Sequence, residues 1–132
     1  HAYQVGQGLM ALEPIMQAEK PDLILVSGDT NATLAGSLCA SQLRIPLAHI
    51  EAGLRSFNRA MVEEMNRVTT DHLSQWLFTP TDQATLNLKT EGLVKGVYQV
   101  GDVMLDACQL FVKIAESANR AFWDTHQLTL DS

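Results

Sequence analysis

Short apolar runs that alternate with longer segments of helical spacing are the feature that most constrains how this chain can fold. The run from Leu23 to Ser27 is continuous and rich in β-type residues, which predicts a strand buried on both faces. Three similar runs follow, at residues 46–50, 76–79 and 97–100. The segments between the runs have helical spacing. Strict alternation with short connections predicts right-handed βαβ crossovers and a mostly parallel α/β sheet.

Start and stop residues define the predicted helices. Pro21 stops the first helix, Thr30 or Asn31 caps the second, and Thr81 caps the fourth, which Gly92 ends. Alanine, glycine and serine dominate the second helix, so we expect it to pack closely on the sheet. The predicted helices cover residues 3–20, 31–43, 63–74, 82–91 and 103–122.

Composition and charge limit the class of protein. The chain has 132 residues, of which 46% are hydrophobic and 18% are charged, as expected for one folded domain. The net charge of −6 and the lack of a basic patch argue against a nucleic-acid partner. The apolar runs are too short to span a bilayer, and the start of the chain does not resemble a signal peptide. We therefore predict a cytoplasmic protein with no membrane partner.

Cysteine and histidine residues receive structural interpretations. Cys39 and Cys108 are far apart and lie in apolar helical patterns, which predicts two buried free thiols rather than a disulfide or a metal site. His49 precedes the end of the second strand, so we predict a structural role for it. His72 lies on an amphipathic helix, where we expect it to be structural or exposed.

Acidic residues follow two of the predicted strands. Asp29 comes after the first strand, and Glu51 comes directly after the second. Ligands bind at the carboxyl ends of the strands in an open parallel sheet, so we expect both carboxylates in one cleft. Glu63, Glu64 and Arg67 begin the next helix. Glu63 and Arg67 share a helix face because they are four residues apart.

Each of these residues also has a purely structural interpretation. Asp29 could cap the helix that follows it, and Glu51 could be a hydrogen-bonded turn residue. Glu63 and Glu64 could be first-turn acids favoured by the helix dipole, with Arg67 as their surface partner. Taken together, the residues favour a functional cluster in one cleft.

Several carboxylates in one cleft have a chemical consequence. They repel one another, which raises the proton affinity of at least one of them. One carboxyl can then stay protonated while another is ionised, so that one accepts a proton and another delivers one. A nearby arginine can hold a carboxylate in its anionic form or bind an anionic substrate. The residues therefore predict an acid/base enzyme and leave its substrate open.

Four segments of the chain form recognisable motifs, namely KPDLILVSGDT at 20–30, HIEAGLR at 49–55, EEMNR at 63–67 and GDVMLDA at 101–107. They resemble segments of the non-hydrolysing UDP-N-acetylglucosamine 2-epimerases. They occur in the order and at nearly the spacing of that family, and the resemblance covers about residues 5–116. Val62 stands where the family usually has proline, which is a departure at the start of a helix.

The resemblance implies a fold and a reaction. The family has two Rossmann-like domains that face a cleft, the GT-B arrangement. Residues 1–105 would be the C-terminal portion of the first domain, and residues 106–132 a helix that leads toward the second. The implied activity interconverts UDP-GlcNAc and UDP-ManNAc by anti-elimination of UDP and its re-addition to 2-acetamidoglucal. It needs no metal or redox cofactor, and the full-length protein would be a homodimer.

Site roles follow from the same motifs. The resemblance implies that Asp29, Glu51 and Glu63 are the acid/base groups and that Arg67 contacts the substrate or positions Glu63. Arg55 and Glu64, in the same segments, are predicted to bind the substrate. Two other hypotheses stay open, namely a GT-B glycosyltransferase that uses a UDP-sugar, and a fragment without activity of its own. The segments around Glu51 and Glu63 favour the epimerase.

Overall fold

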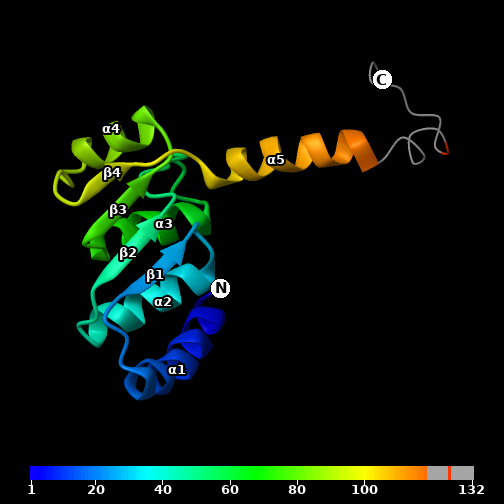
Figure 1. Ribbon diagram of the computed structural model, residues 1–132. Coiled ribbons are helices and arrows are strands. Elements are labelled where there is room, and N and C mark those ends of the chain that lie inside the picture. Colours follow the sequence, from blue (N-terminus) through cyan, green and yellow to red (C-terminus); the bar gives the residue numbers. More distant parts are fainter. Residues whose placement is uncertain (119–124, 126–132) are drawn as a thin grey trace. The chain divides into compact units, whose positions relative to one another are not determined.

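The computed structural model describes residues 1–118 and residue 125 (Figure 1). The chain divides into two compact units, residues 1–101 and residues 102–132. The boundary that the family resemblance predicts, after residue 105, stays a prediction. No helix in the described part of the chain is both long enough and apolar enough to cross a membrane.

The first unit is built on a parallel sheet of four short strands in the order β1-β2-β3-β4. This confirms the predicted parallel α/β architecture, because helices and strands alternate as the sequence indicates. The strands are β1 (Ile24–Ser27), β2 (Leu47–Ile50), β3 (Trp76–Thr79) and β4 (Val97–Gln99). The helices of this unit are α1 (Ala2–Glu19), α2 (Asn31–Gln42), α3 (Val62–Leu73) and α4 (Asp82–Thr90).

Local side-chain contacts explain where the helices begin and end. The Thr30 hydroxyl accepts a hydrogen bond from the backbone N–H of Thr33 at 3.3 Å and caps α2. The Thr81 hydroxyl caps α4 in the same way, with the N–H of Ala84 at 3.1 Å. Both predicted caps are therefore confirmed, and they satisfy N–H groups that the first turn of a helix leaves free.

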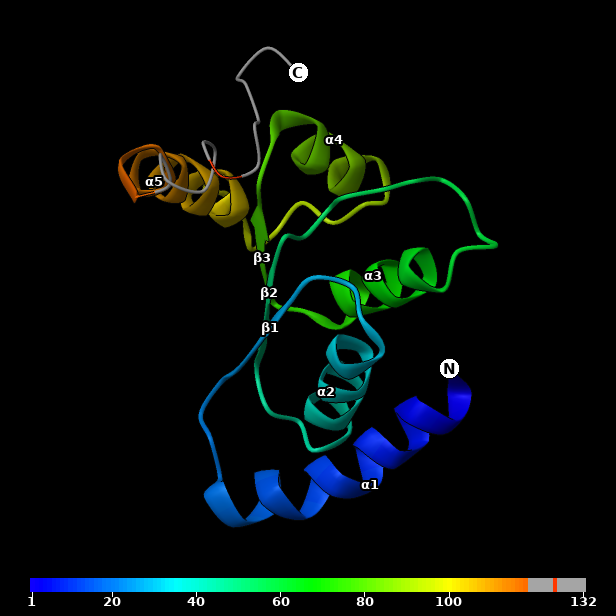
Figure 2. The ribbon, with the colours of Figure 1, turned by 90° about the vertical axis from the view of Figure 1, so that its right-hand side faces the viewer.

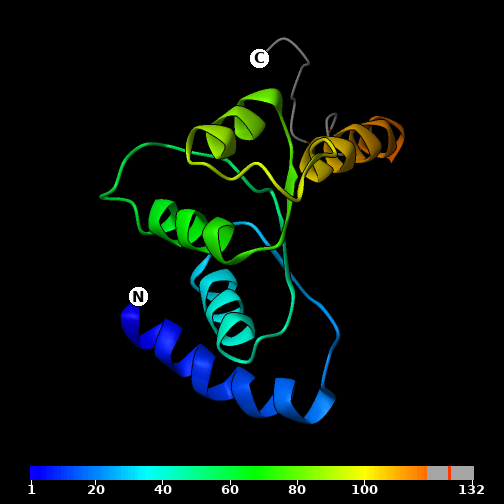
Figure 3. The ribbon, with the colours of Figure 1, turned by 90° about the vertical axis from the view of Figure 1, so that its left-hand side faces the viewer.

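Helices α2, α3 and α4 all cover the same face of the sheet, as the two side views show (Figures 2 and 3). Each connects neighbouring parallel strands in the same direction, and right-handed crossovers of that kind place every helix on one side. On the two central strands, β2 and β3, the residues that face these helices are at most 1% exposed. They include Leu47, His49, Leu77 and Thr79.

The opposite face of the sheet is open within the first unit, so the prediction that the first strand is buried on both faces is wrong. Leu25 on β1 is 55% exposed. It is in register with Ala48 and, through it, with Trp76 on β3, and both Trp76 and Tyr98 on β4 are exposed. The physical reason is that α2, α3 and α4 lie together on the other side.

Small residues let α2 approach both the sheet and α1, as its composition predicts. A Cβ atom on Gly36 would stand 3.3 Å from Cγ1 of Val26 on β1. A Cβ atom on Gly8 of α1 would stand 2.9 Å from the Cβ of Ala35. Near β3 the core is formed instead by larger side chains, where Leu77 and Leu88 pack around Ala52.

The second unit contains helix α5 (Val103–Ala118). The carboxylate of Asp102 accepts a hydrogen bond from the N–H of Met104 at 2.8 Å and so caps the helix. The predicted extension of this helix to residue 122 lies outside the described residues. Cys108 is exposed on this helix, whereas Cys39 is buried on α2. The prediction of a buried thiol is therefore confirmed for Cys39 and wrong for Cys108, because α5 presents its apolar residues to solvent within its own unit.

The difference between the two faces of the sheet can be measured on this chain. We expect Leu77→Ala to lower the free energy of unfolding by about 2–5 kcal/mol, because it opens a cavity in the core. Leu25→Ala is the matched control on the open face, and we expect it to cost less than about 1 kcal/mol. Urea denaturation of both variants checks this, and equal losses would contradict the assignment of the faces.

Candidate functional site

The strand ends bring Glu51 and Asp29 to the same edge of the sheet. Ser27 and Ile50 are register partners, and the N–H of Gly28 donates to the carbonyl of Ile50 at 3.2 Å. A Cβ atom on Gly28 would stand 3.3 Å from Oε2 of Glu51. The Glu51 carboxylate therefore lies beside Gly28, the residue that precedes Asp29.

Glu51 has an unusual backbone conformation for a residue with a side chain. Its φ angle is 68°, in the left-handed region. Such a conformation costs of the order of 1–3 kcal/mol in a non-glycine residue and persists only where the surroundings impose it. No hydrogen bond or ion pair joins the Glu51 carboxylate to another described residue, so the hydrogen-bonded turn interpretation is not what the structure shows.

Helix α3 holds Asp29 at two points. The Arg67 guanidinium forms an ion pair with the Asp29 carboxylate, and the side-chain amide of Asn66 donates to the Asp29 backbone carbonyl at 2.9 Å. Thr30, not Asp29, caps the following helix. The capping interpretation of Asp29 therefore fails, and its carboxylate is directed to α3.

Glu64 is buried and holds the loop that precedes α3. Its carboxylate accepts hydrogen bonds from the N–H and hydroxyl of Ser56, each at 2.9 Å, from the N–H of Phe57 at 3.0 Å and from Arg67 at 2.9 Å. Burial alone would raise the pKa of Glu64, but these hydrogen bonds outweigh burial and the pKa lies below its ordinary value. Glu64 is thus more than a first-turn acid.

Glu63 and Arg67 form no hydrogen bond or ion pair with each other, although they are four residues apart. Arg67 pairs with Glu64 at i−3 instead, and burial of its guanidinium is outweighed by Asp29 and Glu64, which together raise the pKa of Arg67. Glu63 is exposed in the first turn of α3 and has no hydrogen bond or ion pair with any residue the structure describes. Its carboxylate is therefore free to meet a ligand.

Arg55 is directed into the protein. Its Nε and Nη2 atoms donate to the two carboxylate oxygens of Glu91 at 2.7 and 2.8 Å. Its Nη1 atom donates to Oδ2 of Asp71 and to the carbonyl of Leu54, both at 2.7 Å. The side chain is 1% exposed. Four of the five N–H donors of the guanidinium are engaged, and the buried side chain presents almost no surface to a substrate.

Asp71 is a central residue of this region that the sequence analysis missed. It is fully buried. Its Oδ1 atom lies 2.6 Å from Nδ1 of His49, and its Oδ2 atom accepts hydrogen bonds from Arg55 and, at 3.1 Å, from the N–H of Gly53. The second ring nitrogen of His49 lies 2.8 Å from the carbonyl of Gly28. The predicted structural role of His49 is confirmed.

Two further polar residues of α3 are His72 and Asn66. His72, next to Asp71, is exposed, as expected, and lies 3.3 Å from Glu91. Asn66 is buried and was also missed. The only signal for Asn66 was its place between Glu64 and Arg67, and Asp71 gave none, because an acid beside a histidine on an amphipathic helix looks like a surface residue.

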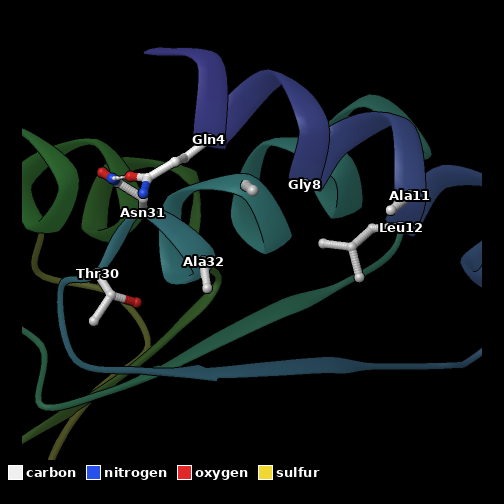
Figure 4. A pocket seen from close by; sticks show the side chains of 8 residues that line it. Gln4, Gly8, Ala11, Leu12, Thr30, Asn31 and Ala32 are labelled. Atoms are coloured by element: carbon white, nitrogen blue, oxygen red, sulfur yellow. Dashed lines mark hydrogen bonds between the residues drawn. The ribbon is translucent and has the colours of Figure 1, made fainter. Parts of the chain in front are cut away.

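An open apolar hollow lies between α1 and α2, next to this edge of the sheet (Figure 4). The amides of Gln4 and Asn31 meet at one end of it, where Asn31 donates to Gln4 at 2.6 Å. The residues that line the hollow carry no charge, so acid/base chemistry belongs to the strand ends and not here. No three potential metal ligands of the types His, Cys, Asp and Glu cluster among residues 1–118 and 125.

A family model described as UDP-N-acetylglucosamine 2-epimerase matches residues 1–130. A UDP-N-acetylglucosamine 2-epimerase homolog of Methanococcus maripaludis is 55% identical over 119 residues, which are 90% of this chain and 33% of the relative. The UDP-2,3-diacetamido-2,3-dideoxy-D-glucuronate 2-epimerase of Pseudomonas aeruginosa is 51% identical over 120 residues, 89% of this chain and 34% of the relative.

A solved structure is similar as well. The crystal structure of Methanocaldococcus jannaschii UDP-GlcNAc 2-epimerase in complex with UDP-GlcNAc and UDP matches with a TM-score of 0.85 and 48% identity. The match covers 92% of this chain and 34% of that one. The chain therefore spans about a third of the length of the relatives it matches.

The lowered pKa of Glu64 predicts how stability depends on pH. Because the folded state binds this proton more weakly than the unfolded state, the contribution of Glu64 is complete above the ordinary pKa of 4.5 and is lost as the pH falls through the folded pKa. We expect the free energy of unfolding to fall more steeply below that pH in the wild-type chain than in Glu64→Gln. Urea denaturation at a series of pH values checks this, and parallel curves would contradict it.

Proposed function

The chain belongs to the UDP-N-acetylglucosamine 2-epimerase family and carries part of its GT-B fold, and from this premise we propose that the whole protein inverts C2 of a UDP-linked 2-acetamido sugar without net hydrolysis. The favoured pair is UDP-GlcNAc and UDP-ManNAc. The observation that carries the proposal is the meeting of Glu51 with the Gly28–Asp29 segment at adjacent strand ends, where Arg67 of α3 pairs with Asp29.

The chemistry explains why several carboxylates are needed. A proton on C2 of a sugar is too weakly acidic to exchange by itself, so its removal has to be coupled to departure of UDP. A base takes the C2 proton, the C–H electron pair becomes the C1–C2 double bond, and the C1–O bond breaks with its electrons on UDP. UDP then adds back to C1 of 2-acetamidoglucal while an acid delivers a proton to the opposite face of C2.

We assign the proton transfers to Asp29, Glu51 and Glu63. General acid and base groups must come within hydrogen-bond reach of the proton they move, and carboxylates from two strand ends and one helix can approach a sugar ring from different sides. Arg67 holds Asp29, which supports a role in orienting that carboxylate and in meeting the anionic substrate. The predicted alternative, that Arg67 positions Glu63, stays a prediction, and the ion pairs of Arg67 are with Asp29 and Glu64.

Arg55 and Glu64 were predicted to bind the substrate, and that role stays a prediction. Their contacts support another contribution to the same site. Glu64 holds the loop at Ser56 and Phe57, and Arg55 ties the start of that loop to Asp71 and Glu91. We propose that these two residues shape the loop between Glu51 and α3.

The substrate has a second candidate. The Pseudomonas aeruginosa relative, at 51% identity, is named for a UDP-2,3-diacetamido-2,3-dideoxy-D-glucuronate. Both sugars carry the 2-acetamido group and the C2 hydrogen that the mechanism needs, and they differ at C3 and C6. A glycosyltransferase is less well supported, since the reported relatives are 2-epimerases or a homolog of one. A homodimer and a cytoplasmic location stay predictions.

The proposal is tested with the full-length protein in deuterium oxide. We expect interconversion of UDP-GlcNAc and UDP-ManNAc with deuterium incorporation at C2, followed by NMR, and the diacetamido-glucuronate sugar is assayed in parallel. Asp29→Asn, Glu51→Gln and Glu63→Gln should each lower kcat by about 10²- to 10⁴-fold. Asp22→Asn, at an exposed acid before β1, is the control and should keep the wild-type rate. Turnover without deuterium at C2 would contradict the mechanism.

Residues 1–132 alone should not turn over either sugar. The relatives are about three times as long, and a site built from a third of such a protein lacks the surfaces that would hold UDP and exclude water. The same NMR assay on the isolated chain checks this. Measurable epimerisation by the isolated chain would refute it.

A further inference from the structure

The turn that carries Glu51 is left-handed at both ends. Glu51 has a φ angle of 68° and Gly53 one of 80°, and the turn directly follows β2. A glycine adopts such a conformation readily, but a glutamate does so only where its surroundings impose it. Some group must therefore hold the turn in place.

The buried carboxylate of Asp71 contacts both sides of this turn. Its Oδ1 atom lies 2.6 Å from His49, two residues before Glu51, and its Oδ2 atom accepts from the N–H of Gly53, two residues after Glu51, at 3.1 Å. Glu51 thus lies between two anchors on a single side chain. Asp71 comes from α3, the helix that also presents Glu63 and Arg67 to the site.

The anchor at Gly53 is rigid. Its carbonyl accepts from the side-chain amide of Asn87 at 2.9 Å, and a Cβ atom on Gly53 would stand 2.3 Å from the carbonyl oxygen of Ala84. The backbone of Gly53 is therefore fixed against α4. Asp71 ties the turn to α3 as well. The turn is therefore held by two helices, α3 and α4.

The anchor at His49 reaches the other strand end. The Nε2 atom of His49 lies 2.8 Å from the carbonyl of Gly28, the residue before Asp29. His49 is fully buried. The contact from Asp71 through His49 to Gly28 therefore links the backbone that carries Asp29 to the turn that carries Glu51.

We propose that Asp71 is a positioning residue for the reaction, because its two oxygens fix the Glu51 turn and, through His49, the strand end that carries Asp29. The proposal rests on the proposed function in assigning Glu51 to proton transfer. Asp71 does not touch the sugar. It sets where the reacting carboxylates stand, and its loss should slow the chemical step more than it weakens substrate binding.

The first test is Asp71→Asn in the full-length protein. This nearly isosteric change leaves one acceptor oxygen where the wild-type protein has two, so one anchor of the turn is lost. A displacement of a reacting group by about 1 Å can cost about 10²-fold in rate. We expect kcat to fall by about 10- to 100-fold with little change in KM, the pattern of an interaction that serves the transition state.

Leu47→Ala is the matched control. Leu47 is 1% exposed and lies on the same strand as His49, at its opposite end. Its truncation should lower the midpoint of thermal unfolding at least as much as Asp71→Asn does, while kcat stays near the wild-type value. An equal fall of kcat in both variants would mean that general loosening of the protein is the cause, and it would overturn the positioning role.

A crystal structure of the Asp71→Asn protein gives a readout that does not depend on turnover. We expect the φ angle of Glu51 to leave the left-handed region and its carboxylate to move away from Gly28. His49→Gln, which removes the anchor at His49 and leaves Asp71 intact, should shift kcat in the same direction and serves if the first variant does not fold. An unmoved Glu51, or a wild-type kcat in either variant, would overturn the proposal. A wild-type protein without epimerase activity would overturn the proposed function alone.

Discussion

A single buried carboxylate, that of Asp71, organises the half of the sheet that matters for function. A buried charge is costly unless it is paired and hydrogen-bonded, and Asp71 meets that condition with His49, Arg55 and the N–H of Gly53. Arg55 then extends the network to Glu91 at the end of α4. Strand β2, the turn after it, α3 and α4 are thus joined by charge-assisted hydrogen bonds. Helices α1 and α2 are joined by the contact of small residues and by the uncharged hydrogen bond from Asn31 to Gln4.

The arrangement of the site follows from the topology of the sheet. Parallel strands end at one edge, so the acids that follow β1 and β2 come close together although they are far apart in the sequence. The helix that follows β2 then brings Asn66 and Arg67 to Asp29 and leaves Glu63 exposed to a ligand. The residues that could react are at the edge, and the residues that hold them are in the interior.

Much of this could be predicted from the sequence, and the limits have physical causes. Helix caps at Thr30 and Thr81 are local, and so they are readable from a few neighbouring residues. The partner of Arg55 is Glu91, 36 residues away, and no local pattern reveals it. The motif around Glu63 and Arg67 predicts a shared helix face, but the structure uses the i−3 pair with Glu64 because that carboxylate also satisfies the N–H groups of the preceding loop. Leu25 is exposed because the helices that connect the strands all pack on the opposite face of the sheet. The apolar run alone does not indicate which face they cover.

The open face of the sheet has an optical consequence. Trp76 lies on that face with 38% of its surface exposed, in register with Ala48 of β2. The emission maximum of an indole ring shifts to shorter wavelength as water around it is replaced by apolar groups. Trp76 is therefore an intrinsic fluorophore on the sheet face that no helix of the first unit covers. Its emission maximum should shift to shorter wavelength when apolar groups cover that face.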